Sequence, residues 1–192
     1  MTYQELCYTI LTLLATLGLY FYWKFINLKV ENTDRTGGHI IAEALKSLGV
    51  KQAFTLVGGH ISSILVECDK LGIKIIDVRD EASTVFAADV IGRLTNIPGV
   101  AMVTAGPGVT NTTTALQNAK MAQSPLLLIG GAAPTLLKGR GALQDIDQVS
   151  AIAPYVKKVF SCTTVRSILP NLQKAMQLAI EHPRGPVFLE AP

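Results

Sequence analysis

From residue 37 onwards, the chain alternates between two patterns of hydrophobic and polar positions. Short runs of consecutive apolar or β-branched residues predict strands buried on both faces, because a strand with one wet face would alternate instead. Between these runs, apolar residues recur at i, i+3 and i+4, which predicts amphipathic helices. The predicted strands are QAFTLV (52–57), IKIIDV (73–78), VAMVT (100–104), PLLLIG (125–130), VKKVFSC (156–162) and PVFLE (186–190). The predicted helices cover 39–48, 61–71, 82–94, 111–122 and 167–181.

Strands separated by helices predict a parallel sheet, because each helical crossover returns the chain to the same edge. Gly49 and Gly72 each follow a predicted helix, in the position where a left-handed residue commonly ends one. We therefore expect an α/β fold, a doubly wound parallel six-stranded sheet flanked by helices. This domain is expected to cover 37–192, after a polar and turn-rich linker at 27–36.

The first residues follow a different pattern. From Leu6 to Trp23 no residue is charged, and at roughly 1.5 Å per residue a helix of this length spans about 27 Å, close to a bilayer core. A cleaved signal peptide would begin with basic residues and end in small ones, but here Glu5 precedes the run and aromatic residues end it. The sequence therefore predicts a leader at 1–5 and one transmembrane helix, an uncleaved anchor, at 6–26.

Composition and charge narrow the function further. Only 16% of the residues are charged and 49% are hydrophobic, which argues against a disordered chain. The net charge is +3 and the basic residues are scattered, so we expect no nucleic-acid partner. The three cysteines are far apart and odd in number, which fits neither a zinc site nor a disulfide framework. Lys24 and Lys29 follow the apolar run, which favours a cytosolic main domain.

Candidate chemistry is expected beyond the carboxyl ends of the strands, where open parallel sheets bind ligands. The glycines that flank Pro107 allow backbone angles closed to other residues, so the main chain there can lie against a flat ligand. A plain tight turn is the alternative interpretation. Thr110 or Asn111 is expected to cap the helix that follows. The three stretches at such strand ends are VGGH (57–60), RDE (79–81) and TAGPGVTN (104–111).

Two familiar phosphate-binding motifs are absent. No Gly-Lys-Ser/Thr follows the glycine-rich turn, and the G-x-G-x-x-G fingerprint does not occur. A nucleotide phosphate therefore lacks its usual backbone cradle in this sequence.

Glu81 stands where the second of these stretches meets the next helix, and two interpretations are open. A surface carboxylate at a helix start is stabilised by the macrodipole, by roughly 0.3–1 kcal/mol, and needs no other role. However, IIDV before it and STVFAADVIG after it are largely apolar. Such surroundings fit a carboxyl group held in a dry pocket for acid–base chemistry.

Taken in order, the motifs after the linker resemble the pyrimidine-binding domain of thiamine-diphosphate-dependent enzymes. The resemblance covers 37–192 and is strongest to the acetolactate-synthase-like branch, which includes benzaldehyde lyase and the 2-hydroxyacyl-CoA lyases. It rests on LVGGHI, DVRDEASTVFAADVIGRL, VTAGPGVTNTTTALQNAKMAQSPLLLIGG, GRGALQDIDQVSAIAPYVKK and RGPVFLEAP.

The resemblance implies a role for the cofactor-binding residues. The family's motif glutamate corresponds to Glu81, and it hydrogen-bonds the N1′ atom of the cofactor's aminopyrimidine, which favours the tautomer that activates the cofactor. The family's GPG-type turn corresponds to Gly106, Pro107 and Gly108 and packs its backbone against the same ring. Many relatives have histidine where this chain has Asp80, a position that only flanks the motif.

The resemblance also implies two further active-site residues. His60 matches a histidine, and Gln144 a glutamine, that line the active site in benzaldehyde lyase-like relatives. Both are candidates for proton transfer or hydrogen bonding to the reacting groups. The alternatives are a loop histidine that caps a helix and a loop glutamine exposed to water. Asp145 and Asp147 are interpreted as solvated loop acids rather than a metal pair.

The implied cofactors are thiamine diphosphate and Mg²⁺. In the family, the Mg²⁺ ligands and the diphosphate clamp belong to a later domain, so we expect them outside this chain and no metal ligand within it. The family also builds its site between two subunits, which implies a homodimer or homotetramer. This chain is accordingly expected to be part of a longer enzyme and inactive alone.

The first hypothesis for the whole protein is a membrane-anchored lyase of fatty acid α-oxidation. It would cleave 2-hydroxy fatty acyl-CoA to formyl-CoA and a shortened aldehyde, at the endoplasmic reticulum membrane. One alternative is an acetolactate synthase-like carboligase that acts on 2-oxo acids. Another is a non-catalytic membrane-tethered module with the same fold. The sequence leaves the acyl substrate and its chain length open.

Overall fold

A computed structural model describes residues 3–26 and 35–192, and the chain divides into two units, Met1–Asp34 and Arg35–Pro192. The described part of the first unit is one helix, α1 (Tyr3–Ile26). Among the described residues, no helix is long and apolar enough to cross a membrane. The transmembrane helix predicted at 6–26 is therefore not confirmed. Most of the predicted linker, and the start of the predicted leader, lie outside the described residues.

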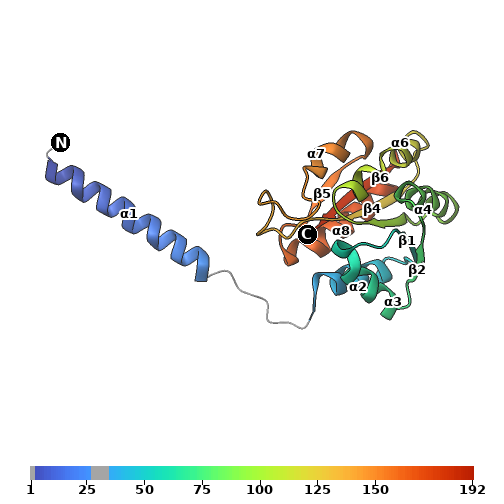
Figure 1. The fold of residues 1–192 in the computed structure, drawn as a ribbon, viewed down its shortest axis with the longest axis horizontal. Coiled ribbons are helices and arrows are strands. Elements are labelled where there is room, and N and C mark those ends of the chain that lie inside the picture. The colour runs from blue at the N-terminus through green and yellow to red at the C-terminus, as the bar shows by residue number, and fades with distance from the viewer. Residues whose placement is uncertain (1–2, 27–34) are drawn as a thin grey trace. The chain divides into compact units, whose positions relative to one another are not determined.

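The second unit is built on a six-stranded sheet in the order β2-β1-β3-β4-β6-β5 (Figure 1). Every neighbouring pair is parallel, which confirms the predicted parallel six-stranded α/β sheet. The two outermost strands are short or only partly buried, whereas β3, β4 and β6 are buried along their whole length. The strands are β1 (Gln52–Thr55), β2 (Lys74–Asp77), β3 (Gly99–Val103), β4 (Leu126–Gly131), β5 (Val159–Ser161) and β6 (Pro186–Ala191).

Helices pack on both faces of this sheet. The predicted helix at 111–122 is α6, and a separate short helix that was not predicted, α5, precedes it; the predicted helix at 61–71 is preceded by a 3-10 turn, η1. A short helix, α7, and a second 3-10 turn, η2, were not predicted. The elements are α2 (Gly37–Ser47), η1 (Gly59–Ile61), α3 (Ser62–Lys70), α4 (Glu81–Thr95), α5 (Pro107–Thr110), α6 (Thr113–Met121), α7 (Gln148–Ile152), η2 (Ala153–Tyr155) and α8 (Val165–Ile180).

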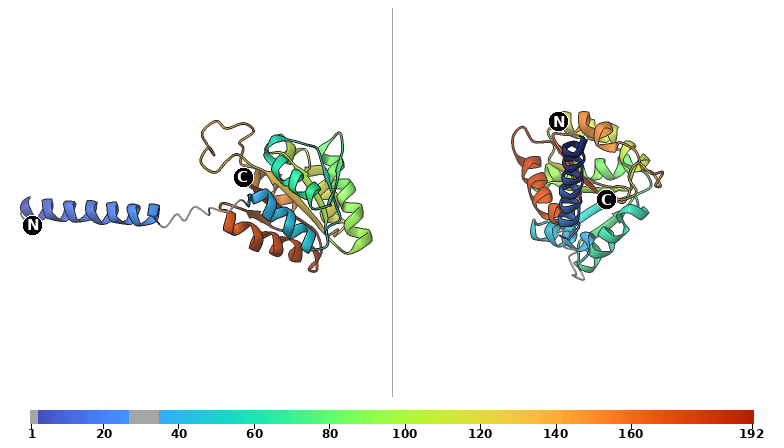
Figure 2. Two further views of the ribbon diagram at one scale, coloured as in Figure 1. Left: turned by 90° about the horizontal axis from the view of Figure 1, so that it is seen from below. Right: turned by 90° about the vertical axis from the view of Figure 1, so that its left-hand side faces the viewer.

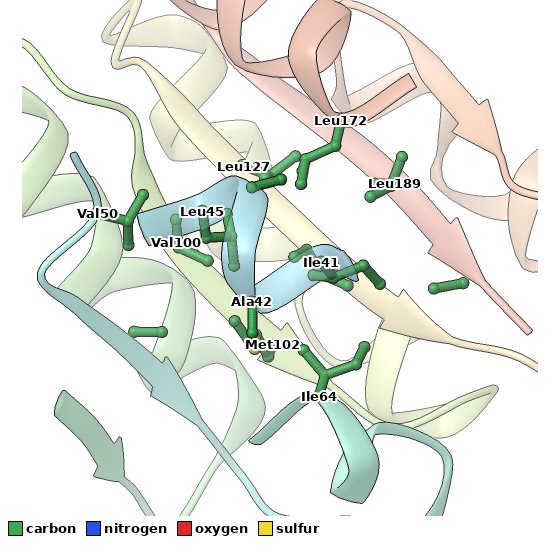
Figure 3. Packing of buried hydrophobic residues seen from close by; sticks show 14 of the residues in the cluster. Ile41, Ala42, Leu45, Val50, Ile64, Val100, Met102, Leu127, Leu172 and Leu189 are labelled. Carbon is green, nitrogen blue, oxygen red and sulfur yellow. The ribbon is translucent and has the colours of Figure 1, made fainter. Parts of the chain in front are cut away.

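Alternate residues of the central strands enter two separate hydrophobic cores. On β4, Leu127 and Ile129 face the core that α2, α3 and α8 cover, and Figure 3 shows Leu127 beside Leu172 of α8. Leu126 and Leu128 face the opposite core, beneath α4 and α6. Each of these four side chains is fully buried, and burying one contributes roughly 1.5–3 kcal/mol. This two-sided burial explains the uninterrupted apolar runs in the sequence.

Two buried thiols give a direct test of this packing. Cys68 and Cys162 are both free; burial raises the pKa of the Cys68 thiol to about 12 and also raises the pKa of Cys162. Because the thiolate is the reactive form, we expect both to resist iodoacetamide at pH 8 in the folded protein and to react in urea. Peptide-level mass spectrometry measures each thiol separately. Rapid labelling of either one without urea would contradict the burial.

Candidate functional site

The three stretches singled out in the sequence meet at the carboxyl edge of the sheet. Strands β2, β1 and β3 are adjacent, and they end at Asp77, Thr55 and Val103 respectively. Because parallel strands point the same way, the segments that follow them lie beside one another at one edge. The prediction from sequence order alone therefore places these segments correctly.

Glu81 is the first residue of α4, but its neighbour caps the helix. The Asp80 carboxylate accepts a hydrogen bond from the Ser83 N–H at 3.0 Å and is the N-cap. The Glu81 side chain is instead directed to another segment, where its Oε2 accepts a hydrogen bond from Asn111 Nδ2 at 3.0 Å. Its other oxygen, Oε1, has no hydrogen-bond partner among the described residues. Glu81 thus lies in the first turn of α4, where the macrodipole stabilises an acid, and its carboxylate also binds another segment.

The surroundings of Glu81 are more open than the sequence suggested. Glu81 is half-buried and its partner Asn111 is exposed. The described residues alone therefore do not enclose the carboxylate in the dry pocket that its apolar neighbours led us to expect.

The prediction that Thr110 or Asn111 caps the next helix is wrong. Thr112 is the N-cap of α6 and makes no side-chain cap bond, while Thr110 Oγ1 donates to the Pro107 carbonyl at 3.3 Å. Asn111 has helical backbone angles, φ −64° and ψ −15°, whereas a side chain that caps requires an extended residue. Its side chain is thereby free to bind Glu81.

The glycine-rich turn has a conformation that requires glycine. Gly106 has φ +63° and ψ −113°, a combination that is strained for any residue with a side chain. A Cβ there would also lie 2.6 Å from the backbone oxygen of Gln144, too close for any carbon. The N–H of Gly106 donates to Gln148 Oε1 at 3.0 Å. The turn is thus fixed from both sides and is not a plain surface turn.

Gly108 connects Glu81 with the rest of the site. A Cβ on Gly108 would lie 2.8 Å from Thr104 Cγ2 and 3.7 Å from Glu81 Oε1. The Thr104 methyl group thus packs against the Cα of Gly108, and the unpaired carboxylate oxygen of Glu81 lies at the edge of the same contact. Gly108 itself is buried, so the group left open to a ligand is the free carboxylate oxygen, which suits a heterocycle that offers a ring nitrogen. These residues therefore fit the aminopyrimidine of thiamine diphosphate.

The structure brings His60 and Gln144 together through a third residue that the sequence did not single out. Thr104 Oγ1 lies 3.0 Å from His60 Nδ1 and donates to Gln144 Oε1 at 3.3 Å. In the arrangement where the hydroxyl gives its proton to Gln144, it accepts from His60 Nδ1–H. The neutral imidazole then has its free electron pair on Nε2, the nitrogen that can accept a proton. Neither side chain has the alternative role: His60 caps no helix and Gln144 is half-buried.

Gln144 lies in a long segment between β4 and α7, residues 132–147, which Figure 2 shows projecting from the domain in gold to brown. Its backbone has φ +58°, an uncommon conformation for a residue with a side chain. Such strain persists only where surrounding contacts hold it. Here the contacts are the Thr104 hydroxyl and the close approach of Gly106.

A cavity of about 330 Å³ adjoins this group of residues. It is lined by the starts of α2 and α8 and by apolar side chains that include Ile41, Ile64 and Ile168. His60 is part of the lining, but Glu81 and the glycine turn are not. His60 therefore stands between the carboxyl edge of the sheet and this cavity.

Within residues 3–26 and 35–192, no group of three or more His, Cys, Asp or Glu side chains is placed to hold a metal ion. Asp147 caps α7 by accepting from the Ser150 N–H at 3.1 Å, and hydrogen bonds from Ser150 lower the pKa of its carboxyl. Asp145 accepts from the Gly139 N–H. Asp145 and Asp147 thus stabilise the loop by accepting backbone hydrogen bonds and are not merely solvated.

Replacing Thr104 with valine tests the link between His60 and Gln144. The change keeps the shape but removes the hydroxyl, so the tautomer of His60 is no longer fixed. We expect the turnover rate of the full-length protein to fall by about tenfold, the value of one hydrogen bond of ordinary strength. Thr114→Val on the exposed side of α6 is the matched control. Equal rates for both variants would show that the hydroxyl has no part in the reaction.

Comparison with known proteins adds independent information. The family model described as "Thiamine pyrophosphate enzyme, N-terminal TPP binding domain" matches residues 35–151, which is more than half of the chain. The chain is 60% identical over 162 residues to the 2-hydroxyacyl-CoA lyase 2 of Danio rerio, a match that covers 84% of this chain and 26% of the relative. It is 54% identical over 165 residues to the Homo sapiens protein of the same name, covering 85% and 26%.

A second type of relative has a different name. The chain is 41% identical over 155 residues to a "Probable acetolactate synthase" of Mycobacterium bovis, covering 81% of this chain and 28% of that protein. The chain thus spans about a quarter of the length of each of these relatives.

Proposed function

This chain belongs to the thiamine pyrophosphate enzyme family and carries its N-terminal TPP binding domain, and on that premise we propose that it holds the pyrimidine half of the cofactor in a carbon–carbon lyase. The observation that supports this most strongly is the Oε1 of Glu81, which has no hydrogen-bond partner among the described residues and lies beside the glycine turn at the carboxyl edge of the sheet. A half-buried carboxyl group beside a glycine turn at a sheet edge suits a flat heterocycle with a basic ring nitrogen.

Each residue then has a role that follows from its position. Thiamine diphosphate, when bound, supplies the stabilised carbanion that such chemistry requires. Glu81 holds a proton at the pyrimidine N1′ through Oε1, while Asn111 keeps Oε2 in place. The backbone of Gly106 and Gly108 orients the ring. His60 accepts the proton of the substrate hydroxyl at Nε2, because Thr104 fixes Nδ1 as the protonated nitrogen.

The proposed substrate is a 2-hydroxy fatty acyl-CoA, cleaved to formyl-CoA and an aldehyde shortened by one carbon, as in fatty acid α-oxidation. The support is the name and the high identity of relatives such as the Danio rerio and Homo sapiens proteins. The test is to incubate the full-length protein with thiamine diphosphate, Mg²⁺ and 2-hydroxyacyl-CoA of several chain lengths and to measure formyl-CoA. Release of formyl-CoA supports the assignment, and its absence at every chain length contradicts it.

Carboligation of 2-oxo acids is the second candidate function. The similarity to a probable acetolactate synthase favours it, and both reactions use the same pyrimidine site. The same preparation should therefore be incubated with pyruvate. Acetolactate without formyl-CoA would replace the lyase by a carboligase, while cofactor binding with neither product would point to another substrate class.

Mg²⁺ and a second subunit complete the proposed site. Because the chain spans about a quarter of the length of its relatives, we place the Mg²⁺ ligands and the diphosphate clamp in regions outside this chain. Glu81 is only half-buried here, and an opposing surface would remove it from water. We propose that this surface belongs to another subunit of a homodimer or homotetramer, which sedimentation of the full-length protein would detect. A monomer with full activity would contradict it.

We also propose that residues 6–26 attach the protein to the endoplasmic reticulum membrane, with the main domain in the cytosol. The support is the sequence alone, an uncharged run from Leu6 to Trp23 followed by Lys24. Alkaline carbonate should leave the full-length protein in the microsomal membrane and release a variant that lacks residues 1–34. Release of both proteins would contradict the anchor.

A further inference from the structure

A buried polar network lies behind the glycine turn, and the functions described so far do not use it. Gln148 and Glu190 are both almost fully buried, with 2% and 1% of their surface exposed. Gln148 Nε2 donates to Glu190 Oε1 at 3.0 Å and to the Gly131 carbonyl at 2.8 Å. Its Oε1 accepts from the N–H of Gly106 at 3.0 Å. A single side chain thus joins the end of the sheet to the first glycine of the turn.

The Glu190 carboxylate determines which way the Gln148 amide points. An ionised carboxylate only accepts hydrogen bonds, so the NH₂ group of Gln148 must face it, as it must face the Gly131 carbonyl. The amide oxygen is therefore directed at Gly106. A flipped amide would set its NH₂ group against the Gly106 N–H and its oxygen against the Gly131 carbonyl, so that both buried groups would lose the partner they have here. At roughly 1–3 kcal/mol for each unpaired group, the flipped orientation is excluded.

Glu190 is held in turn by two other segments. Ser161 Oγ donates to its Oε2 at 2.6 Å, and Lys138 Nζ lies 3.2 Å from the same oxygen. Lys138 belongs to the projecting segment 132–147 that also carries Gln144. The buried charge is thus paired, as a buried carboxylate must be, and the pairing connects the network to the segment that carries Gln144.

We propose that Gln148, oriented by Glu190, is a positioning residue that sets the Gly106 turn at the geometry required to bind the aminopyrimidine. This inference rests on the proposed cofactor site. Gly106 has a positive φ and no side chain that could hold the backbone in place. The hydrogen bond from its N–H to Gln148 is therefore the contact that fixes the peptide group between Ala105 and Gly106. Without this bond the turn can rotate, and the backbone that contacts the ring loses its preorganisation.

The experiment compares three variants of the full-length protein. Gln148→Met keeps the volume and removes both hydrogen-bonding groups, Glu190→Gln keeps an acceptor but removes the charge, and Gln117→Met is the same change as the first at an exposed position on α6. We expect Gln148→Met to weaken thiamine diphosphate binding about tenfold in calorimetry, Glu190→Gln less, and Gln117→Met not at all. Amide hydrogen exchange at Gly106 should accelerate by about tenfold or more in Gln148→Met without cofactor, since its hydrogen bond is lost.

A further control separates positioning from general loss of stability. Val50→Ala creates a cavity at the opposite end of the sheet, just before β1. It should lower the melting temperature and leave the cofactor affinity and Gly106 exchange unchanged. If Gln148→Met binds the cofactor as wild type does, or if its defect is no greater than that of an equally destabilised Val50→Ala, the positioning role is overturned. If the wild-type protein itself binds no thiamine diphosphate, the proposed function fails together with this inference.

Discussion

Replacing Glu81 with glutamine is expected to reduce the rate of C2 proton exchange on bound thiamine diphosphate by roughly 10²–10⁴-fold, the usual contribution of a positioned acid–base group. The glutamine oxygen can still accept the hydrogen bond from Asn111, so the side chain should keep its place. The NH₂ group would then stand where the free Oε1 stands, and it cannot exchange a proton with N1′ in the way a carboxyl does. NMR of the loaded full-length protein measures the exchange, and calorimetry measures the binding.

Cofactor binding itself should change much less, because the backbone of the glycine turn remains. Glu181→Gln, an exposed change at the end of α8, is the matched control and should behave as wild type in both measurements. Exchange at the wild-type rate in Glu81→Gln would remove the carboxylate from the mechanism. Loss of binding without any loss of exchange in the bound fraction would make Glu81 a binding residue only.

Replacing Gly106 with alanine is expected to weaken thiamine diphosphate binding by about 100-fold or more. The new Cβ would need a φ of +63° and would lie 2.6 Å from the Gln144 backbone oxygen. Either the turn or the segment that carries Gln144 must move, and the combined cost to the free energy of unfolding should be about 2–4 kcal/mol. Calorimetry and thermal denaturation measure the two effects.

Gly141→Ala separates the two causes of this effect. Gly141 also has a positive φ, +79°, but its Cβ would meet no atom within 4 Å. It should therefore show only the conformational strain, roughly 1 kcal/mol, with cofactor affinity close to wild type. Wild-type binding by Gly106→Ala would contradict the tight contact at the turn. An equal loss of binding in Gly141→Ala would mean that the contact with Gln144 is not the cause.

The secondary structure was largely predictable because burial on both faces leaves a simple pattern. Leu126 to Ile129 are all fully buried, and an uninterrupted apolar run this short, bounded by turn residues, is typical of a strand buried on both faces. The prediction was poorest at the edge of the sheet, where VKKVFSC forms only a three-residue strand. Lys157 there donates to the carbonyls of Leu178 and Glu181 at the end of α8, a contact that no local pattern reveals.

The residues of the candidate site were likewise only partly predictable from the sequence. Glu81 and the glycine turn stand out because each breaks a regular pattern at a strand end. No such break in the pattern marks Thr104, Gln148 or Glu190, because their importance depends on contacts with residues distant in the sequence. Thr104 and Gln144 are 40 positions apart, and Gln148 is 42 positions from both Gly106 and Glu190. The hydrogen bond from Asn111 to Glu81, 30 positions away, was hidden for the same reason, whereas Asp80 caps α4 through Ser83, three residues on, which is a local signal.

The most direct test of the central claim is a crystal structure of the full-length protein with thiamine diphosphate and Mg²⁺. We expect Glu81 Oε1 within hydrogen-bond distance of the pyrimidine N1′, about 2.6–2.9 Å, with the ring against the backbone of Gly106 and Gly108. A pyrimidine bound elsewhere, or a Glu81 carboxylate that faces solvent with the cofactor in place, would contradict the proposed site.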